Sequence, residues 1–97
     1  MRNHKISLKP TGVPYSRSEI SFFELTQKNG RRISTKELVI KRQLQDPKWK
    51  DIKHPHNTAI VTMTSLMAKI AKNKEPFRLN KSHQRGPYPV EFWIEKR

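Results

Sequence analysis

Lysine and arginine side chains provide most of the chemistry that this sequence can perform. They number 21 against eight aspartates and glutamates, which gives a formal net charge of +13 and a pI near 10.6. This excess is far from the mixed balance of an ordinary small domain and predicts a polyanionic partner. Duplex DNA fits, because neutralising its phosphates releases condensed counterions. RNA and anionic lipid satisfy the same charge, so charge alone predicts a class of partner in which nucleic acid is favoured.

Hydroxyl and lysine side chains recur at helical spacing in the second half of the chain. Thr58, Thr62, Ser65, Lys69 and Lys72 follow one another at i, i+4, i+7, i+11 and i+14, which places them on one face of a helix. An ordinary solvated face explains Thr62 and Ser65 equally well. From Lys69 to the end of the chain, however, basic residues exceed acidic residues by five. This excess favours a binding surface.

Two further groups of residues are candidates for contact with phosphate. Thr35 and Lys36 stand at the start of a predicted helix, whose positive dipole end attracts anions. Lys81, Gln84 and Arg85 stand in a polar, basic segment that is typical of a hairpin tip.

Catalytic and metal-binding patterns are missing from the sequence. It has no glycine-rich phosphate loop, no H-E-x-x-H motif and no paired carboxylates. The absence of cysteine excludes disulfides, thiolate nucleophiles and a classical zinc finger. His54, His56 and His83 lack the further ligands that a structural zinc needs. We therefore expect a protein that is not an enzyme, with no catalytic residues, no cofactor and no metal.

Two helices are predicted in the first half of the chain. The first spans 19–28, with Ser16 or Ser18 as its cap, and Asn29-Gly30 ends it. Since Asn-Gly is also a strong hairpin signal, a β-hairpin joining 20–25 to 33–40 is the alternative. The second helix starts at Ser34, where Ser-Thr-Lys-Glu has the spacing of a capping box, and stops near residue 45 before a proline.

The second half predicts a loop, a long helix and a hairpin. The loop over 45–56 contains a short helical turn, and Trp49 fills the edge of the core. The helix spans 57–72, with Asn57 or Thr58 as its cap. Its core-facing stripe is Met63, Leu66, Met67 and Ile70. Alternating apolar residues then predict a β-hairpin over 77–94.

The length of 97 residues fits one domain. We expect residues 1–18 to form a flexible basic N-terminal arm and residues 19–97 to form the folded domain. No stretch approaches the ~20 apolar residues of a membrane span, and no signal peptide is evident. We expect a cytoplasmic protein with no membrane partner, associated with the nucleoid when bound to DNA.

This order of elements resembles the winged helix-turn-helix superfamily of DNA-binding domains. The resemblance covers about residues 18–97 and rests on "NGRRISTKEL", "NTAIVTMTSLMAKIAKN" and "FRLNKSHQRGPYPVEFWI". It implies a small α+β fold with three helices and a C-terminal β-hairpin wing. It also implies that helix 57–72 enters the major groove while hairpin 77–94 touches the backbone or minor groove. The DNA-binding residues expected on this basis are Thr35, Lys36, Asn57, Thr58, Thr62, Ser65, Lys69, Lys72, Lys81, Gln84 and Arg85.

The function expected from the resemblance is sequence-specific transcription regulation on double-stranded DNA. One alternative is an RNA-binding or ribosome-associated protein, in which Phe77, Tyr88 and Trp93 stack on bases. Another is an architectural protein, such as an excision or replication accessory. A homodimer is possible, through Phe22, Phe23 and Trp93, although these residues fit a core equally well.

Overall fold

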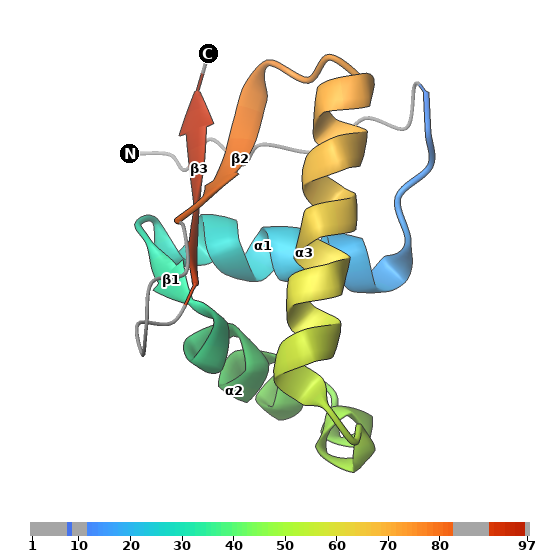
Figure 1. The fold of residues 1–97 in the computed structure, drawn as a ribbon, viewed down its shortest axis with the longest axis vertical. Helices are drawn as coiled ribbons and strands as arrows, with labels where there is room; N and C mark the ends of the chain where they lie inside the picture. Colours follow the sequence, from blue (N-terminus) through green and yellow to red (C-terminus); the bar gives the residue numbers. More distant parts are fainter. Residues whose placement is uncertain (1–7, 9–11, 83–89, 97) are drawn as a thin grey trace.

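The computed structural model describes residues 8, 12–82 and 90–96, and it has an α+β fold (Figure 1). Its elements in chain order are α1 (Arg17–Asn29), β1 (Ile33–Ser34), α2 (Thr35–Gln45), the 3-10 helix η1 (Pro47–Asp51), α3 (Pro55–Lys72), β2 (Phe77–Lys81) and β3 (Glu91–Lys96). The three strands form an antiparallel sheet in the order β1-β3-β2. The expected α+β class, with three α-helices and a C-terminal hairpin, is therefore confirmed for the described part of the chain.

The ends of α1 and α2 follow the local signals in the sequence. Ser16 caps α1 in a complete capping box with Glu19, and Gly30 ends this helix with a φ of 78°. The Ser34 hydroxyl accepts a hydrogen bond from the Glu37 backbone N–H, 3.1 Å away, and so caps α2. Since residues 20–25 and most of 33–40 are helical, the alternative hairpin between them is wrong.

The predicted boundary between arm and domain is wrong for residues 12–18. Helix α1 starts at Arg17, and the segment before it is tied to the far end of α3. Val13 exchanges two hydrogen bonds with the Asn73 side chain, at 2.7 and 2.9 Å. The Tyr15 hydroxyl donates to Glu75 at 2.7 Å. Residues 12–18 therefore belong to the folded domain.

The start of α3 is also corrected. The helix begins at Pro55, two residues before the predicted 57, with His54 as its N-cap residue. Neither Asn57 nor Thr58 caps it. Proline suits the first turn, because a backbone N–H at that position would have no acceptor within the helix, so its absence costs nothing. The φ of proline is also already close to the helical value.

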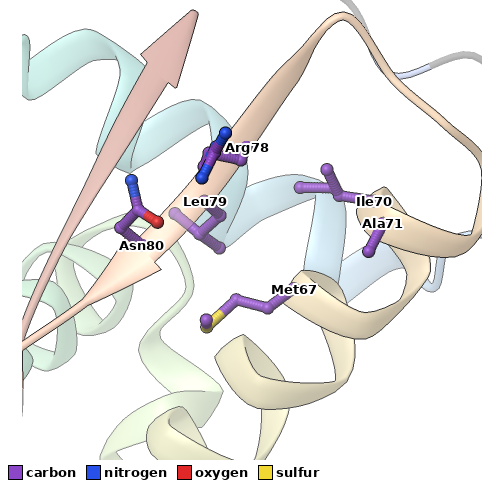
Figure 2. Close-up of a pocket in the computed structure, with 6 residues that line it drawn as sticks. All are labelled: Met67, Ile70, Ala71, Arg78, Leu79 and Asn80. Carbon is purple, nitrogen blue, oxygen red and sulfur yellow. The ribbon is translucent and has the colours of Figure 1, made fainter. Parts of the chain in front are cut away.

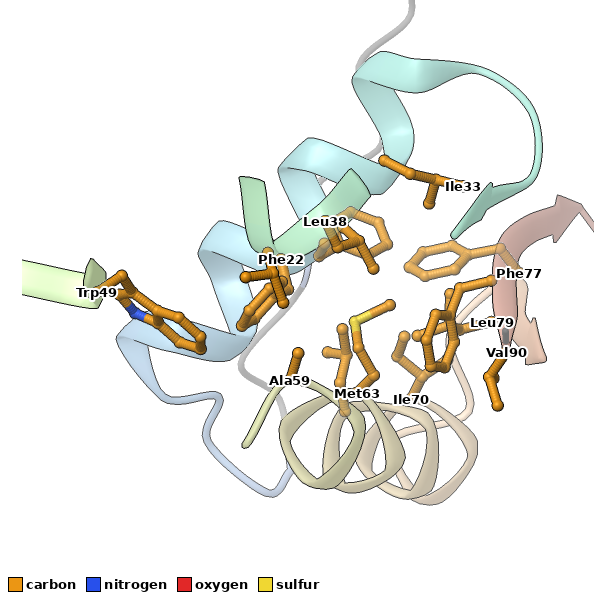
Figure 3. Packing of buried hydrophobic residues seen from close by; sticks show 14 residues of the cluster. Phe22, Ile33, Leu38, Trp49, Ala59, Met63, Ile70, Phe77, Leu79 and Val90 are labelled. Carbon is orange, nitrogen blue, oxygen red and sulfur yellow. The ribbon is translucent and has the colours of Figure 1, made fainter. Parts of the chain in front are cut away.

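The hydrophobic core lies between the helices and the sheet (Figure 3). Phe22 and Phe23 of α1 are at most 1% exposed, so of the two alternatives left open for them they are core residues and not a dimer contact. Trp49 meets Phe22 edge to face, with 5.3 Å between ring centroids, which confirms its predicted place at the edge of the core. The core thereby fixes α3 against α1 on one side and against the sheet on the other.

Candidate nucleic-acid interface

Helix α3 has three different sides. Its buried stripe consists of Ala59, Met63, Leu66 and Ile70. At about 100° per residue, the remaining positions divide into a flank toward α1, a flank toward β2 and an outward side. Figure 1 shows α3 lying in front of α1, with η1 at its lower end and the hairpin beside it. Any ligand of α3 must therefore approach its outward side.

The face predicted to contact DNA is mostly the flank toward α1. The Ser65 hydroxyl donates to Glu19 Oε2 at 2.7 Å, and Lys69 Nζ donates to Glu19 Oε1 at 2.8 Å. Thr62 is half-buried and donates to the backbone carbonyl of Thr58, also half-buried, at 2.8 Å. The structure thus uses the side chains of Ser65 and Lys69 to join α3 to α1. Lys72, in contrast, is exposed.

Glu19 organises this flank as a buried acid. Its side chain is 4% exposed, and it accepts the two hydrogen bonds from α3 and a third from the Ser16 backbone at 2.7 Å. Burial by itself raises the pKa of Glu19. The hydrogen bonds from Lys69, Ser16 and Ser65, together with the charge of Lys69, outweigh burial and hold this pKa below its usual range. Glu19 is therefore ionised, and its contacts with Ser65 and Lys69 form a charged joint between α1 and α3.

Thr35 is also committed to an internal contact. It is 3% exposed, and its hydroxyl donates to the Val90 carbonyl at 2.8 Å, joining α2 to the chain just before β3. Its neighbour Lys36 is exposed and keeps its side chain at the surface. Of this predicted pair, only Lys36 is placed where it can meet a phosphate.

The outward stripe of α3 consists of Asn57, Val61, Thr64 and Ala68. All four are exposed, and they follow one another at i, i+4, i+7 and i+11. Asn57 belongs to the predicted set, whereas the other three do not, because the hydroxyl-and-lysine pattern drew attention to the flank toward α1. They could have been found as the positions opposite the stripe of Met63, Leu66 and Ile70 on a helical wheel.

Lysines surround the two ends of this stripe. Lys48, Lys50 and Lys53, all exposed, precede the N-terminal end of α3, while Lys72 and Lys74, also exposed, stand at its C-terminal end. The sequence contains no acidic residue between Asp51 and Glu75. In this whole segment, a polyanion therefore meets no repelling carboxylate from α3 itself.

A shallow cavity of about 320 Å³ lies between α3 and β2 (Figure 2). Met67, Ile70 and Ala71 contribute from the helix, and Arg78, Leu79 and Asn80 from the strand. Arg78 also lies 3.8 Å from Glu95, an exposed ion pair. The cavity therefore lies on the flank of α3 toward β2.

The predicted wing is described only in part. Lys81, the last residue of β2, is exposed. Gln84 and Arg85 lie outside the described residues. Within the described residues, Lys81 pairs with Phe92, in the antiparallel pairing of β2 with β3.

The aromatic residues of the RNA alternative are not gathered on one surface. Phe77 is fully buried, and Trp93 is half-buried, with the Arg32 guanidinium 4.0 Å from its ring centroid. Tyr88 lies outside the described residues. Phe77 is therefore unable to stack on a base.

Other kinds of site receive no support from the described part of the chain. There, no group of three His, Asp or Glu side chains is placed to hold a metal ion. None of the helices described has the length and apolar character needed to cross a membrane. Comparisons with protein-family models, with curated proteins and with solved structures gave no match.

Proposed function

We propose that this chain is a DNA-binding protein of the winged helix-turn-helix type, and that it is a transcriptional regulator without enzymatic activity. Helix α3 would enter the major groove of a duplex, and the hairpin formed by β2 and β3 would act as the wing. The order of α1, α2, α3 and the hairpin supports this architecture. The alternatives, an RNA-binding protein and an architectural protein, are outcomes of the tests below.

The observation that carries the proposal is the setting of the outward stripe. Asn57, Val61, Thr64 and Ala68 form an exposed, uncharged ridge on a helix that has lysines near both ends and no acidic residue along its length. A helix fits the major groove, where side chains on its outward side can meet base edges while cations near its ends meet phosphates. The stripe would face the bases, and Lys53 and Lys72 would face the two backbones.

The contacts proposed for phosphate differ from those expected from the sequence. Lys36, Lys72 and Lys81 remain in the set because they are exposed, and Lys48, Lys50, Lys53 and Lys74 join it. The hydroxyl of Thr35 and the side chains of Ser65 and Lys69 leave the set, since each has a partner inside the domain.

A titration of the full chain against duplex DNA at several salt concentrations tests this proposal. We expect the logarithm of the binding constant to fall linearly with the logarithm of salt, with a slope of about 0.9 for each phosphate contacted. Replacing Lys53 or Lys72 with Ala should reduce that slope by about one each. Stronger binding to single-stranded RNA than to duplex would favour the RNA-binding alternative.

A matched pair of substitutions locates the interface. Thr64→Glu and Ile20→Glu each add one negative charge at an exposed helical position, the first on the outward stripe and the second on α1. Thr64→Glu should weaken duplex binding by at least about tenfold, because a carboxylate in the groove faces phosphates. Ile20→Glu should change binding by less than about threefold. Equal effects of the two substitutions would contradict the placement of α3 in the groove.

A further inference from the structure

The composition of the outward stripe determines which bases α3 can read. From Pro55 to Ala68 the helix has no Lys, Arg, Asp or Glu. Guanine is most often read by a bidentate Arg or Lys, and cytosine by a carboxylate. The first 14 residues of α3, counted from its 18-residue span Pro55–Lys72, therefore lack the usual partners of a G·C pair.

What the stripe does offer is methyl groups. Val61 is 60% exposed, so its side chain has apolar surface that a ligand can bury. Ala68, seven residues further on, is exposed on the same side. The only apolar group on the floor of the major groove is the C5-methyl group of thymine.

Thr64 adds a further methyl group because of its hydrogen bond. Its hydroxyl donates to the Ile60 carbonyl at 2.8 Å, within the same helix. The donor is thus already used, and the hydroxyl oxygen is turned back toward the helix. A ligand on the outward side meets the Thr64 side chain mainly through its methyl group.

Asn57 provides the polar contact at the N-terminal end of the stripe. It is exposed, and it lies about 16 Å along the helix axis from Ala68, at 1.5 Å per residue. An asparagine amide pairs in bidentate fashion with N6 and N7 of adenine. Its position therefore suits the same base pairs as the methyl groups do.

We propose that α3 recognises A·T-rich DNA by apolar contact between Val61, Thr64 and Ala68 and thymine methyl groups, with Asn57 on adenine. This inference rests on the proposed function and deepens it. The lysines at the ends of α3 hold the duplex, and the stripe selects the sequence. The preference comes from desolvating methyl groups, so it does not depend on salt.

The test starts with selection of duplex DNA from a random pool by the full chain, near 150 mM salt. We expect A·T-rich sequences to be enriched. The selected duplex is then prepared with deoxyuridine in place of thymidine, which removes only the methyl groups. Binding should weaken by about three- to fivefold for each buried methyl group lost, the ratio that burial of one such group gives.

Val61→Ala is the matching protein variant, and Ile20→Ala, an exposed apolar residue on α1, is its control. Val61→Ala should reduce the ratio of thymine to uracil affinity by about threefold or more and leave the salt slope unchanged. Ile20→Ala should change neither. Both variants replace exposed side chains with a good helix former, so both are expected to fold.

The outcomes separate this inference from the proposed function. Salt-dependent binding to duplex with equal affinity for thymine and uracil overturns the methyl contact alone, as does selection of a G·C-rich site. Duplex binding without any sequence enrichment also overturns it and favours an architectural protein. Absence of binding to every duplex overturns both proposals.

Discussion

Replacing Glu19 with Gln would measure how strongly the charged joint holds α1 to α3. Gln keeps the size of the side chain and removes its charge. Breaking one partner of a buried ion pair costs about 3–5 kcal/mol, but Lys69 is 24% exposed and would regain some hydration. Gln also keeps one acceptor oxygen. We expect a loss of about 2–3 kcal/mol, a large part of the ~5–15 kcal/mol that stabilises a typical domain.

Urea unfolding at pH 7 is the appropriate assay, with Glu24→Gln as the control. Glu24 is exposed on the same helix, so its substitution should change stability by less than about 0.5 kcal/mol. A double-mutant cycle with Lys69→Met isolates the coupling between the two charges from the cost of each single change.

A pH series tests the same joint independently. The pKa of Glu19 is lowered in the folded protein, so its contribution to stability is fully present above the unfolded value of about 4.3. That contribution is lost as the pH falls through the lower folded value. The wild-type protein should therefore lose stability below about pH 5 more steeply than Glu19→Gln does. If Glu19→Gln costs under about 0.5 kcal/mol and loses stability below about pH 5 as steeply as the wild-type protein does, this account of the contact between α1 and α3 is refuted.

Three other predictions concern stability. Lys74 has a φ of 53°, a left-handed conformation that costs a residue with a side chain about 1–2 kcal/mol. Lys74→Gly should therefore raise the melting temperature, despite the greater conformational entropy of glycine in the unfolded chain. A lower melting temperature for this variant would contradict the prediction. The Tyr15 pKa is raised to about 12 by burial and by its hydrogen bond to Glu75, so its contribution is present below the unfolded value of about 10 and lost as the pH rises to about 12. Tyr15→Phe should cost about 1 kcal/mol in urea unfolding at pH 7 and should remove the loss of stability between about pH 10 and pH 12. If that loss is unchanged in the variant, it does not come from Tyr15. Leu38→Ala should cost about 2–5 kcal/mol in thermal unfolding, because Leu38 is fully buried. Leu44→Ala is the control: its position is 76% exposed, so it should cost under about 0.5 kcal/mol. Similar losses for the two variants would contradict the described core.

The parts of the fold that were predictable from the sequence are those fixed by local chemistry. The Ser34 hydroxyl and the left-handed Gly30 act within a few residues of their own position, so their patterns were sufficient. Trp49 lies between two prolines in a loop, and its size alone indicated that it fills the core edge. By contrast, β1 has only two residues, too few to show any alternation.

The exposed side of α3 was not predictable in the same way. The apolar stripe identifies the side that is buried, but either flank next to it can hold polar residues. Which flank is covered depends on Glu19, 46 residues before Ser65 in the chain. No periodicity within α3 carries that information, so a pattern that suited DNA pointed to side chains that bind this carboxylate.

The contacts between residues 13–15 and 73–75 have a consequence for how the native protein opens. Helix ends ordinarily fray independently of one another. Here the segment entering α1 and the segment leaving α3 are joined across 60 residues of sequence by the Val13–Asn73 and Tyr15–Glu75 hydrogen bonds. The two ends must therefore open together, and their amide protons should exchange with solvent at a shared rate. Opening of the C-terminal end of α3 is therefore coupled to opening of the chain that precedes α1.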